Sequence, residues 1–168
     1  MPKIIENLEA RLIAEARKQI AQNGYGALNV RELAKACGVG VGTVYNYFPS
    51  KEALIATYLL EDWQQCITAI QAVSTYSDVP RQVVLCIYDH LNAFAQRHTA
   101  IFRDEAAAAV FAGSFSQYHG MLREQLAQPL RRFVSSDFDA QFLAEALLTW
   151  TMAGKEFHEI YGILEKLF

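Results

Sequence analysis

Residues 24–54 read GYGALNVRELAKACGVGVGTVYNYFPSKEAL, and this segment indicates the architecture of the chain. It contains two short patterns of helical periodicity, 30–36 and 41–48, separated by a turn at Gly38. Asn29 is a suitable N-cap for the first pattern. Two short helices joined across a glycine turn are typical of a helix-turn-helix, in which the second helix enters the major groove of DNA.

The second of these helices presents two kinds of side chain. Val44 and Phe48 are four residues apart and are expected to be buried. Pro49 ends the helix, because proline disfavours helical geometry at the residue before it. The outward positions carry hydroxyl and amide groups, which bind phosphates or base edges; they are Thr43, Tyr45, Asn46 and Tyr47. The alternative is that the aromatic residues only form a core, which we adopt for Phe48 alone.

The segment resembles the DNA-binding domain of the TetR family of bacterial transcriptional regulators. The motifs that carry the resemblance are Gly24-Tyr25, Cys37-Gly38-Val39, Gly42 to Phe48, and Ser50 to Leu54. Together they cover about the first third of the chain, whereas the rest is similar only in length and helical character. The resemblance implies an all-α fold, with an N-terminal helix-turn-helix domain and a C-terminal helical domain for ligand binding and dimerisation.

The resemblance also assigns DNA contacts residue by residue. Thr43, Tyr45 and Tyr47 match positions that touch DNA, and Lys51 matches a phosphate-binding lysine. With the outward-facing groups, the predicted DNA-binding residues are Asn29, Arg31, Gly42, Thr43, Tyr45, Asn46, Tyr47 and Lys51. The sequence departs from the family at Gly40, where a serine cap is usual, and at Val41, where a polar or basic residue is common.

Composition and charge narrow the classes of function. The 168 residues are 52% hydrophobic with a net charge of -3. Residues 1–52 hold seven Lys or Arg against five Glu, so this part is +2 and the remainder is -5. Such an asymmetry favours DNA contact by the first part. We see no signal peptide or membrane span and expect a cytoplasmic protein.

The three cysteines are expected to be structural. Cys37, Cys66 and Cys86 have no CxxC spacing, and the four histidines lack metal-ligand spacing, so neither a metal site nor a cofactor is expected. A redox switch at Cys37 is disfavoured because nothing in its sequence neighbourhood lowers the thiol pKa. No motif of a hydrolase, metalloprotease or nucleotide-binding enzyme occurs, and we predict that the protein is not an enzyme.

The remainder of the chain shows only helical patterns. We expect helices over 4–23, 51–73, 81–97, 99–112, 115–134 (interrupted at Pro129), 138–153 and 155–167. The predicted domains are 1–50, which bind DNA, and 51–168, which regulate and dimerise.

Two groups of apolar residues in the second domain suggest further sites. The last two helices carry more large apolar groups than a small core can hide, which predicts a two-fold dimer interface; it comprises Phe138, Phe142, Ala146, Leu147, Trp150, Phe157, Ile160 and Leu164. The central helices hold aromatic groups suited to a hydrophobic or aromatic effector, although plain core packing is the simpler explanation for each one; they are Trp63, Tyr88, Phe94, Phe102, Phe111, Tyr118 and Met121.

These features predict a homodimeric repressor that binds a palindromic DNA operator and is released by a small molecule. One alternative is a TetR-like coactivator that has lost DNA binding, which the substitutions at Gly40 and Val41 keep open. Another is an enzyme that uses the helical pocket. A steep salt dependence of binding to duplex DNA distinguishes the regulator from the coactivator, and the absence of catalytic motifs disfavours the enzyme.

Overall fold

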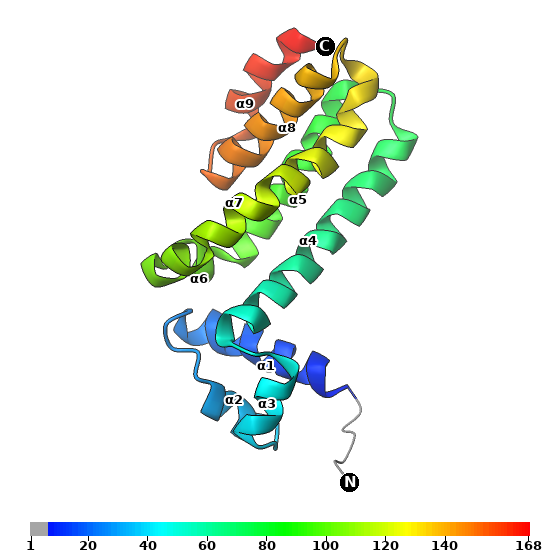
Figure 1. The fold of residues 1–168 in the computed structure, drawn as a ribbon. Coiled ribbons are helices and arrows are strands. Elements are labelled where there is room, and N and C mark those ends of the chain that lie inside the picture. The colour runs from blue at the N-terminus through cyan, green and yellow to red at the C-terminus, as the bar shows by residue number, and fades with distance from the viewer. Residues whose placement is uncertain (1–6) are drawn as a thin grey trace. The chain divides into compact units, whose positions relative to one another are not determined.

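The computed structural model describes residues 7–168, except for the side chains of 111–117, and the fold is helical throughout (Figure 1). The chain forms two compact units. The N-terminal unit comprises Met1–Glu61 and Thr99–Ala112, and the C-terminal unit comprises Asp62–His98 and Gly113–Phe168. The N-terminal unit therefore includes a later segment of the chain that sequence periodicity does not connect to it.

The N-terminal unit is built from three short helices and the start of a long one. They are α1 (Leu8–Asn23), α2 (Val30–Ala36), α3 (Val41–Tyr47) and the first part of α4 (Lys51–Tyr76). Each boundary has a local cause. Gly24 ends α1 with a φ of 83°, which glycine adopts at little cost. The Asn29 side chain caps α2 by accepting the Arg31 backbone N–H at 2.8 Å, which confirms the predicted cap.

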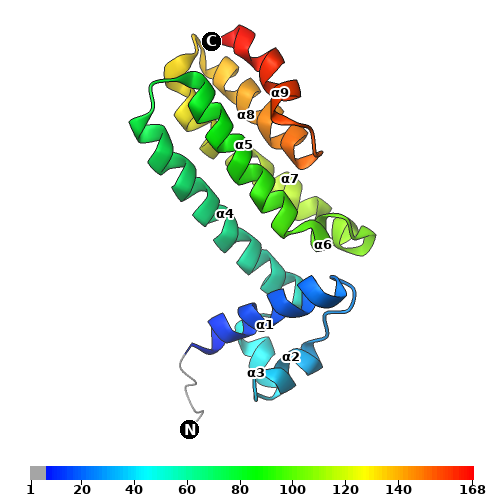
Figure 2. The same ribbon diagram turned by 180° about the vertical axis from the view of Figure 1, so that it is seen from behind.

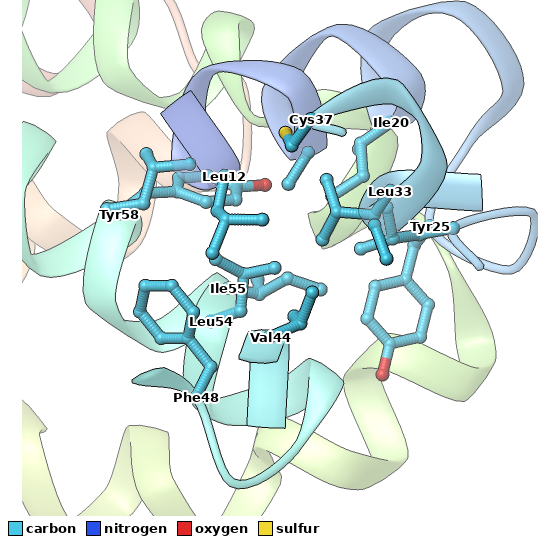
Figure 3. Packing of buried hydrophobic residues seen from close by; sticks show 14 of the residues in the cluster. Leu12, Ile20, Tyr25, Leu33, Cys37, Val44, Phe48, Leu54, Ile55 and Tyr58 are labelled. Atoms are coloured by element: carbon cyan, nitrogen blue, oxygen red, sulfur yellow. The ribbon is translucent and has the colours of Figure 1, made fainter. Parts of the chain in front are cut away.

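A single buried cluster holds these helices together (Figure 3). Leu12 of α1, Leu33 of α2 and Ile55 of α4 are each 0% exposed, and Val44 of α3 packs among them. Ile101 and Ala107 from the later segment join the same cluster. Removing one fully buried leucine from such a core costs about 2–5 kcal/mol, so this cluster fixes the orientation of α3.

The later segment differs from the sequence prediction. The break expected near Gly113 is wrong, since α6 (Thr99–Phe102) ends earlier and α7 (Glu105–Ala127) runs through that position. Asp104 decides the boundary, because its carboxylate accepts the Ala107 backbone N–H at 2.9 Å and caps α7. A glycine inside a helix costs only about 1 kcal/mol relative to alanine, and this cost did not end the helix.

The C-terminal unit packs α5 (Pro80–Arg97) against α8 (Asp137–Met152), with α9 (Phe157–Leu164) beside both (Figures 1 and 2). The predicted interruption at Pro129 is confirmed, because α7 gives way to a 3-10 helix, η1 (Gln128–Phe133). The chain ends in a second 3-10 turn, η2 (Glu165–Leu167).

Two buried side-chain contacts tie α4 to its neighbours within this unit. The Trp63 indole Nε1 donates to Gln125 Oε1 at 2.7 Å, and its ring meets Phe94 edge-on with 5.6 Å between centroids. Directly before Trp63, Asp62 forms a buried pair with His98, with 2.9 Å between Oδ2 and Nε2. Within residues 7–168, no helix combines the length and apolarity that crossing a bilayer requires.

Candidate nucleic-acid interface

The turn between α2 and α3 is held rigidly. Gly38 has a φ of 70°, a conformation that side chains disfavour, and the Val39 backbone N–H donates to Ala34 O at 2.9 Å. From α1, the Arg11 guanidinium donates to Cys37 O at 2.9 Å. Hydrogen bonds to α2 and from α1 therefore hold the turn in place.

The outward face of α3 is polar but uncharged. Val44 and Phe48 are buried at 2% and 4% exposure, whereas Tyr45 and Tyr47 are 48% and 41% exposed. Asn46 is also exposed. The predicted division between core and outward aromatic residues is thus confirmed. It gives α3 two phenol hydroxyls and one amide that can hydrogen-bond phosphates or bases.

The start of α3 has few side chains because two of its positions are glycine. Gly40 occupies the N-cap position in extended geometry and offers no side-chain hydrogen bond. Gly42 is exposed, and a Cβ built on it meets no atom within 4 Å. The fold of this chain therefore does not require glycine at position 42. Thr43, between Gly42 and Val44, is half-buried.

Positive charge beside α3 comes from α2. Arg31 and Lys35 are exposed, and among the described residues neither side chain has an acidic partner. Asn29 uses its Oδ1 for the helix cap, which leaves the amide nitrogen able to donate. Lys35 was not among the residues predicted from sequence, although its exposed position in α2 resembles that of Arg31.

Lys51 has an intramolecular role that the sequence did not reveal. Its Nζ donates to Tyr25 O at 2.7 Å and lies 4.0 Å from the centre of the Tyr25 ring. An ammonium has three donor hydrogens, so a phosphate contact by Lys51 stays a prediction and uses the donors that remain. The Gly24-Tyr25 motif was recognised in the sequence, but the contact of Tyr25 with Lys51 was not.

Tyr25 and Glu52 complete this buried corner. The Tyr25 hydroxyl donates to Glu52 Oε1 at 3.4 Å. Burial, and then the charge of Glu52, raises the pKa of the Tyr25 phenol. Donation by its own backbone N–H, with the Ser50 and Tyr25 hydroxyls, lowers the pKa of the Glu52 carboxyl. This arrangement anchors the start of α4 against the segment that precedes α2.

A hollow of about 440 Å³ lies between the start of α2 and α3. Its walls include the exposed Asn29, Arg31 and Tyr45, and the half-buried Val41. Polar and apolar residues therefore line a space that opens beside Tyr45 of α3. A hollow at this place can accept part of a bound nucleic acid.

The predicted effector-lining residues fall into different environments. Trp63, Tyr88 and Phe94 are buried in the C-terminal unit, where Trp63 contacts Phe94 and the Tyr88 hydroxyl donates to Lys155 O at 3.2 Å. Tyr118 and Met121 are exposed, and Phe102 is exposed in the N-terminal unit. Phe111 lies outside the described side chains. An effector site stays a prediction.

The residues predicted to form the dimer interface differ in their exposure. Leu147, Ile160 and Leu164 are buried within the chain itself, at 0%, 5% and 2% exposure, so they belong to its core. Ala146 and Phe157 are half-buried. Those still available to a partner are Phe138, Phe142 and Trp150, at 74%, 49% and 51% exposure, and α9 adds Ile163 at 66%.

Among the described residues, no three His, Cys, Asp or Glu side chains form a group that could hold a metal ion. Burial raises the pKa of all three thiols, that of Cys66 to about 11. Burial thus favours the protonated form of each thiol.

Comparison with known proteins places this interface in a family. Residues 12–58 match the family model of bacterial regulatory proteins, tetR family. YuxN, an uncharacterised HTH-type transcriptional regulator of Bacillus subtilis, is 41% identical over 73 residues, which are 44% of this chain and 25% of that protein. UidR, an HTH-type transcriptional regulator of Escherichia coli, is 24% identical over 92% of this chain and 78% of its own.

The fold extends the similarity to the whole chain. A transcriptional regulator from Cytophaga hutchinsonii superposes with a TM-score of 0.71 at 18% identity, over 96% of this chain and 92% of the other. The matched segment contains α2, the turn and α3, where the exposed tyrosines and the bare glycines lie. The helix-turn-helix segment of this chain therefore belongs to the TetR family of DNA-binding transcriptional regulators, and the whole chain shares the fold of such a regulator.

Proposed function

We propose that the protein is a repressor that binds a palindromic operator as a homodimer and leaves it when a small molecule binds. The observation that carries the proposal is the outward face of α3, where Tyr45, Asn46 and Tyr47 are exposed above a fully packed core. The proposed repressor acts on the chromosome, in the cytoplasm. KstR, a repressor of Mycolicibacterium smegmatis, is 31% identical over 60% of this chain and 50% of its own.

The small DNA-contacting surface of α3 supports a homodimer. One seven-residue helix supplies little of the roughly 1,000–2,500 Å² that specific DNA recognition buries. Two copies related by a two-fold axis double this surface and require half-sites roughly 34–36 Å apart, or a multiple of that spacing. The operator is therefore expected to be an inverted repeat.

The exposed apolar groups of α8 and α9 supply the surface that joins the copies. Phe138 and Phe142 lie one turn apart on α8, with 6.5 Å between their ring centroids, and Trp150 follows two turns later. Ile163 is exposed on α9, which packs against α8. Exposed groups of this size mark interaction sites, and two helices from each copy form a four-helix bundle.

The effector is proposed to be a small hydrophobic or aromatic molecule. Two proteins with this fold have been crystallised with such compounds: RolR with resorcinol (TM-score 0.60, 21% identity) and FadR of Bacillus subtilis with stearoyl-CoA (TM-score 0.56, 20% identity). In the present chain, the aromatic pair of Trp63 and Phe94 is the proposed site of contact. A coupling of about 1–3 kcal/mol between effector and DNA is sufficient for regulation.

Selection of bound duplexes from a random pool tests this function directly. The expected product is an inverted repeat, bound with an affinity that falls steeply as salt rises, because phosphate contacts release counterions. Repeating the selection with a metabolite mixture should lower the recovery of that sequence. Recovery of unrelated duplexes, or binding that does not respond to salt, would contradict the proposal and favour a coactivator that acts through protein contacts.

A further inference from the structure

The helix assigned to base recognition carries no charged residue. The sequence of α3 is VGTVYNY, and the nearest described cations flanking it in sequence are Lys35 of α2 and Lys51 of α4. The commonest specific contact to DNA is an arginine or lysine bound to guanine O6 and N7. Because α3 cannot make that contact, its selectivity must rest on uncharged groups.

Val41 is the apolar group best placed to read a base. It is the first residue of α3, and the N-terminal residues of a recognition helix are those that contact base edges. Its side chain is half-buried: one part packs against the core cluster, and another borders the hollow beside Tyr45. The core contact fixes the side chain, so little conformational entropy remains to be lost on binding DNA.

The glycines on both sides add no side chain that could cover the exposed part of Val41. Gly40 and Gly42 carry no side chains, so Val41 alone presents side-chain carbon within residues 40–42. Gly42 lies on the side of α3 opposite the buried Val44, where a missing side chain permits close approach. In the major groove, the apolar feature that distinguishes one base from the others is the 5-methyl group of thymine.

We propose that Val41 determines specificity by packing against a thymine 5-methyl group, so that each operator half-site requires one A·T pair in a fixed orientation. The inference rests on the proposed function, because it assumes that α3 enters the major groove. It adds the identity of the base and the residue that reads it.

Replacing thymine with deoxyuridine tests the contact, because this change removes only the 5-methyl group and preserves pairing. Each thymine of a selected half-site is replaced in turn, and the affinity of the full-length protein is measured by fluorescence anisotropy. One position should weaken binding about fourfold per half-site, the value expected for one buried methyl group. In Val41→Ala, which removes both γ-methyl groups, the same replacement should have a smaller effect than in the unaltered protein.

Val39→Ala is the matched control. Val39 is also a half-buried valine that packs against the core cluster, but it lies in the turn before α3. This variant should keep the full effect of deoxyuridine. Val41→Thr, which preserves the shape of the side chain, separates loss of the methyl contact from loss of folding and should reduce the deoxyuridine effect.

The outcomes separate the two proposals. If an inverted repeat is bound specifically but no thymine position matters, or if the effect is undiminished in both Val41→Ala and Val41→Thr, the assignment of Val41 is wrong while the proposed regulatory function stands. If no duplex is bound specifically, the proposed function fails, and the inference fails with it.

Discussion

Replacing Gly42 with alanine should raise the stability of the protein while it weakens DNA binding. Gly42 is the second residue of α3 and is exposed, and a Cβ at this position meets no atom within 4 Å. Alanine is favoured over glycine in a helix by roughly 0.5–1 kcal/mol. We take the lower value, about 0.5 kcal/mol, because Gly42 lies in the first turn. For a chain of this length the melting temperature should rise by about 1–2 °C.

The effect on DNA binding should have the opposite sign. Gly42 lies opposite Val44, whose side chain is 2% exposed, so the added methyl group points away from the protein core. If this part of the backbone approaches the DNA closely, the methyl group separates the two surfaces and weakens several contacts at once. We expect at least a tenfold loss of affinity, or about 1.4 kcal/mol.

Gly120→Ala provides the matched control. Gly120 is also exposed within a helix, α7, and a Cβ there meets nothing within 4 Å. The Gly120→Ala variant should therefore have a higher melting temperature and an unchanged affinity for DNA. Calorimetry gives the first quantity, and anisotropy with a selected duplex gives the second. Unchanged affinity in Gly42→Ala would refute the close approach, and a lower melting temperature would refute the reasoning about helix propensity.

Three further predictions test other parts of the structure. Tyr47→Ala should abolish specific DNA binding in anisotropy measurements and leave the sedimentation coefficient unchanged, because this side chain is 41% exposed and contributes little to folding. Trp150→Glu should convert dimer to monomer in analytical ultracentrifugation, whereas Tyr76→Glu, at a 90% exposed aromatic residue, should not. Burial raises the pKa of the Cys66 thiol to about 11, against roughly 8.5 in an unfolded chain, so the stability that this group contributes is complete below pH 8.5 and is lost as the pH rises to about 11. Urea unfolding across that range should show a shallower decline for Cys66→Ala than for the unaltered protein.

Local sequence determined α2, α3 and the turn. Asn29 supplies the cap, Gly38 supplies the positive φ, and the spacing of Val44 and Phe48 defines the buried face. These features depend on neighbours within a few residues, and sequence therefore predicts them well. The same reasoning found the interruption at Pro129, because proline lacks the N–H that a helix requires.

Features that depend on distant contacts were not predictable. Nothing near Lys51 indicates that its ammonium binds the Tyr25 carbonyl, because the two residues meet only through the packing of α4 on the N-terminal unit. The boundary between α6 and α7 was misplaced because Asp104 was not identified as a cap. Similarly, Leu147 and Phe142 are both apolar residues of α8. Only the packing of α8 against α5 and α9 shows that Leu147 is buried and Phe142 is exposed.

Sequence alone determined that the chain is helical and that α3 presents tyrosine and asparagine outward, since both follow from periodicity along one short segment. Only the tertiary structure decided which apolar side chains are buried within the chain, and which of its cations are already held by other residues. Burial and ion pairing both depend on residues that are distant in the sequence. Their positions are fixed when the helices pack together.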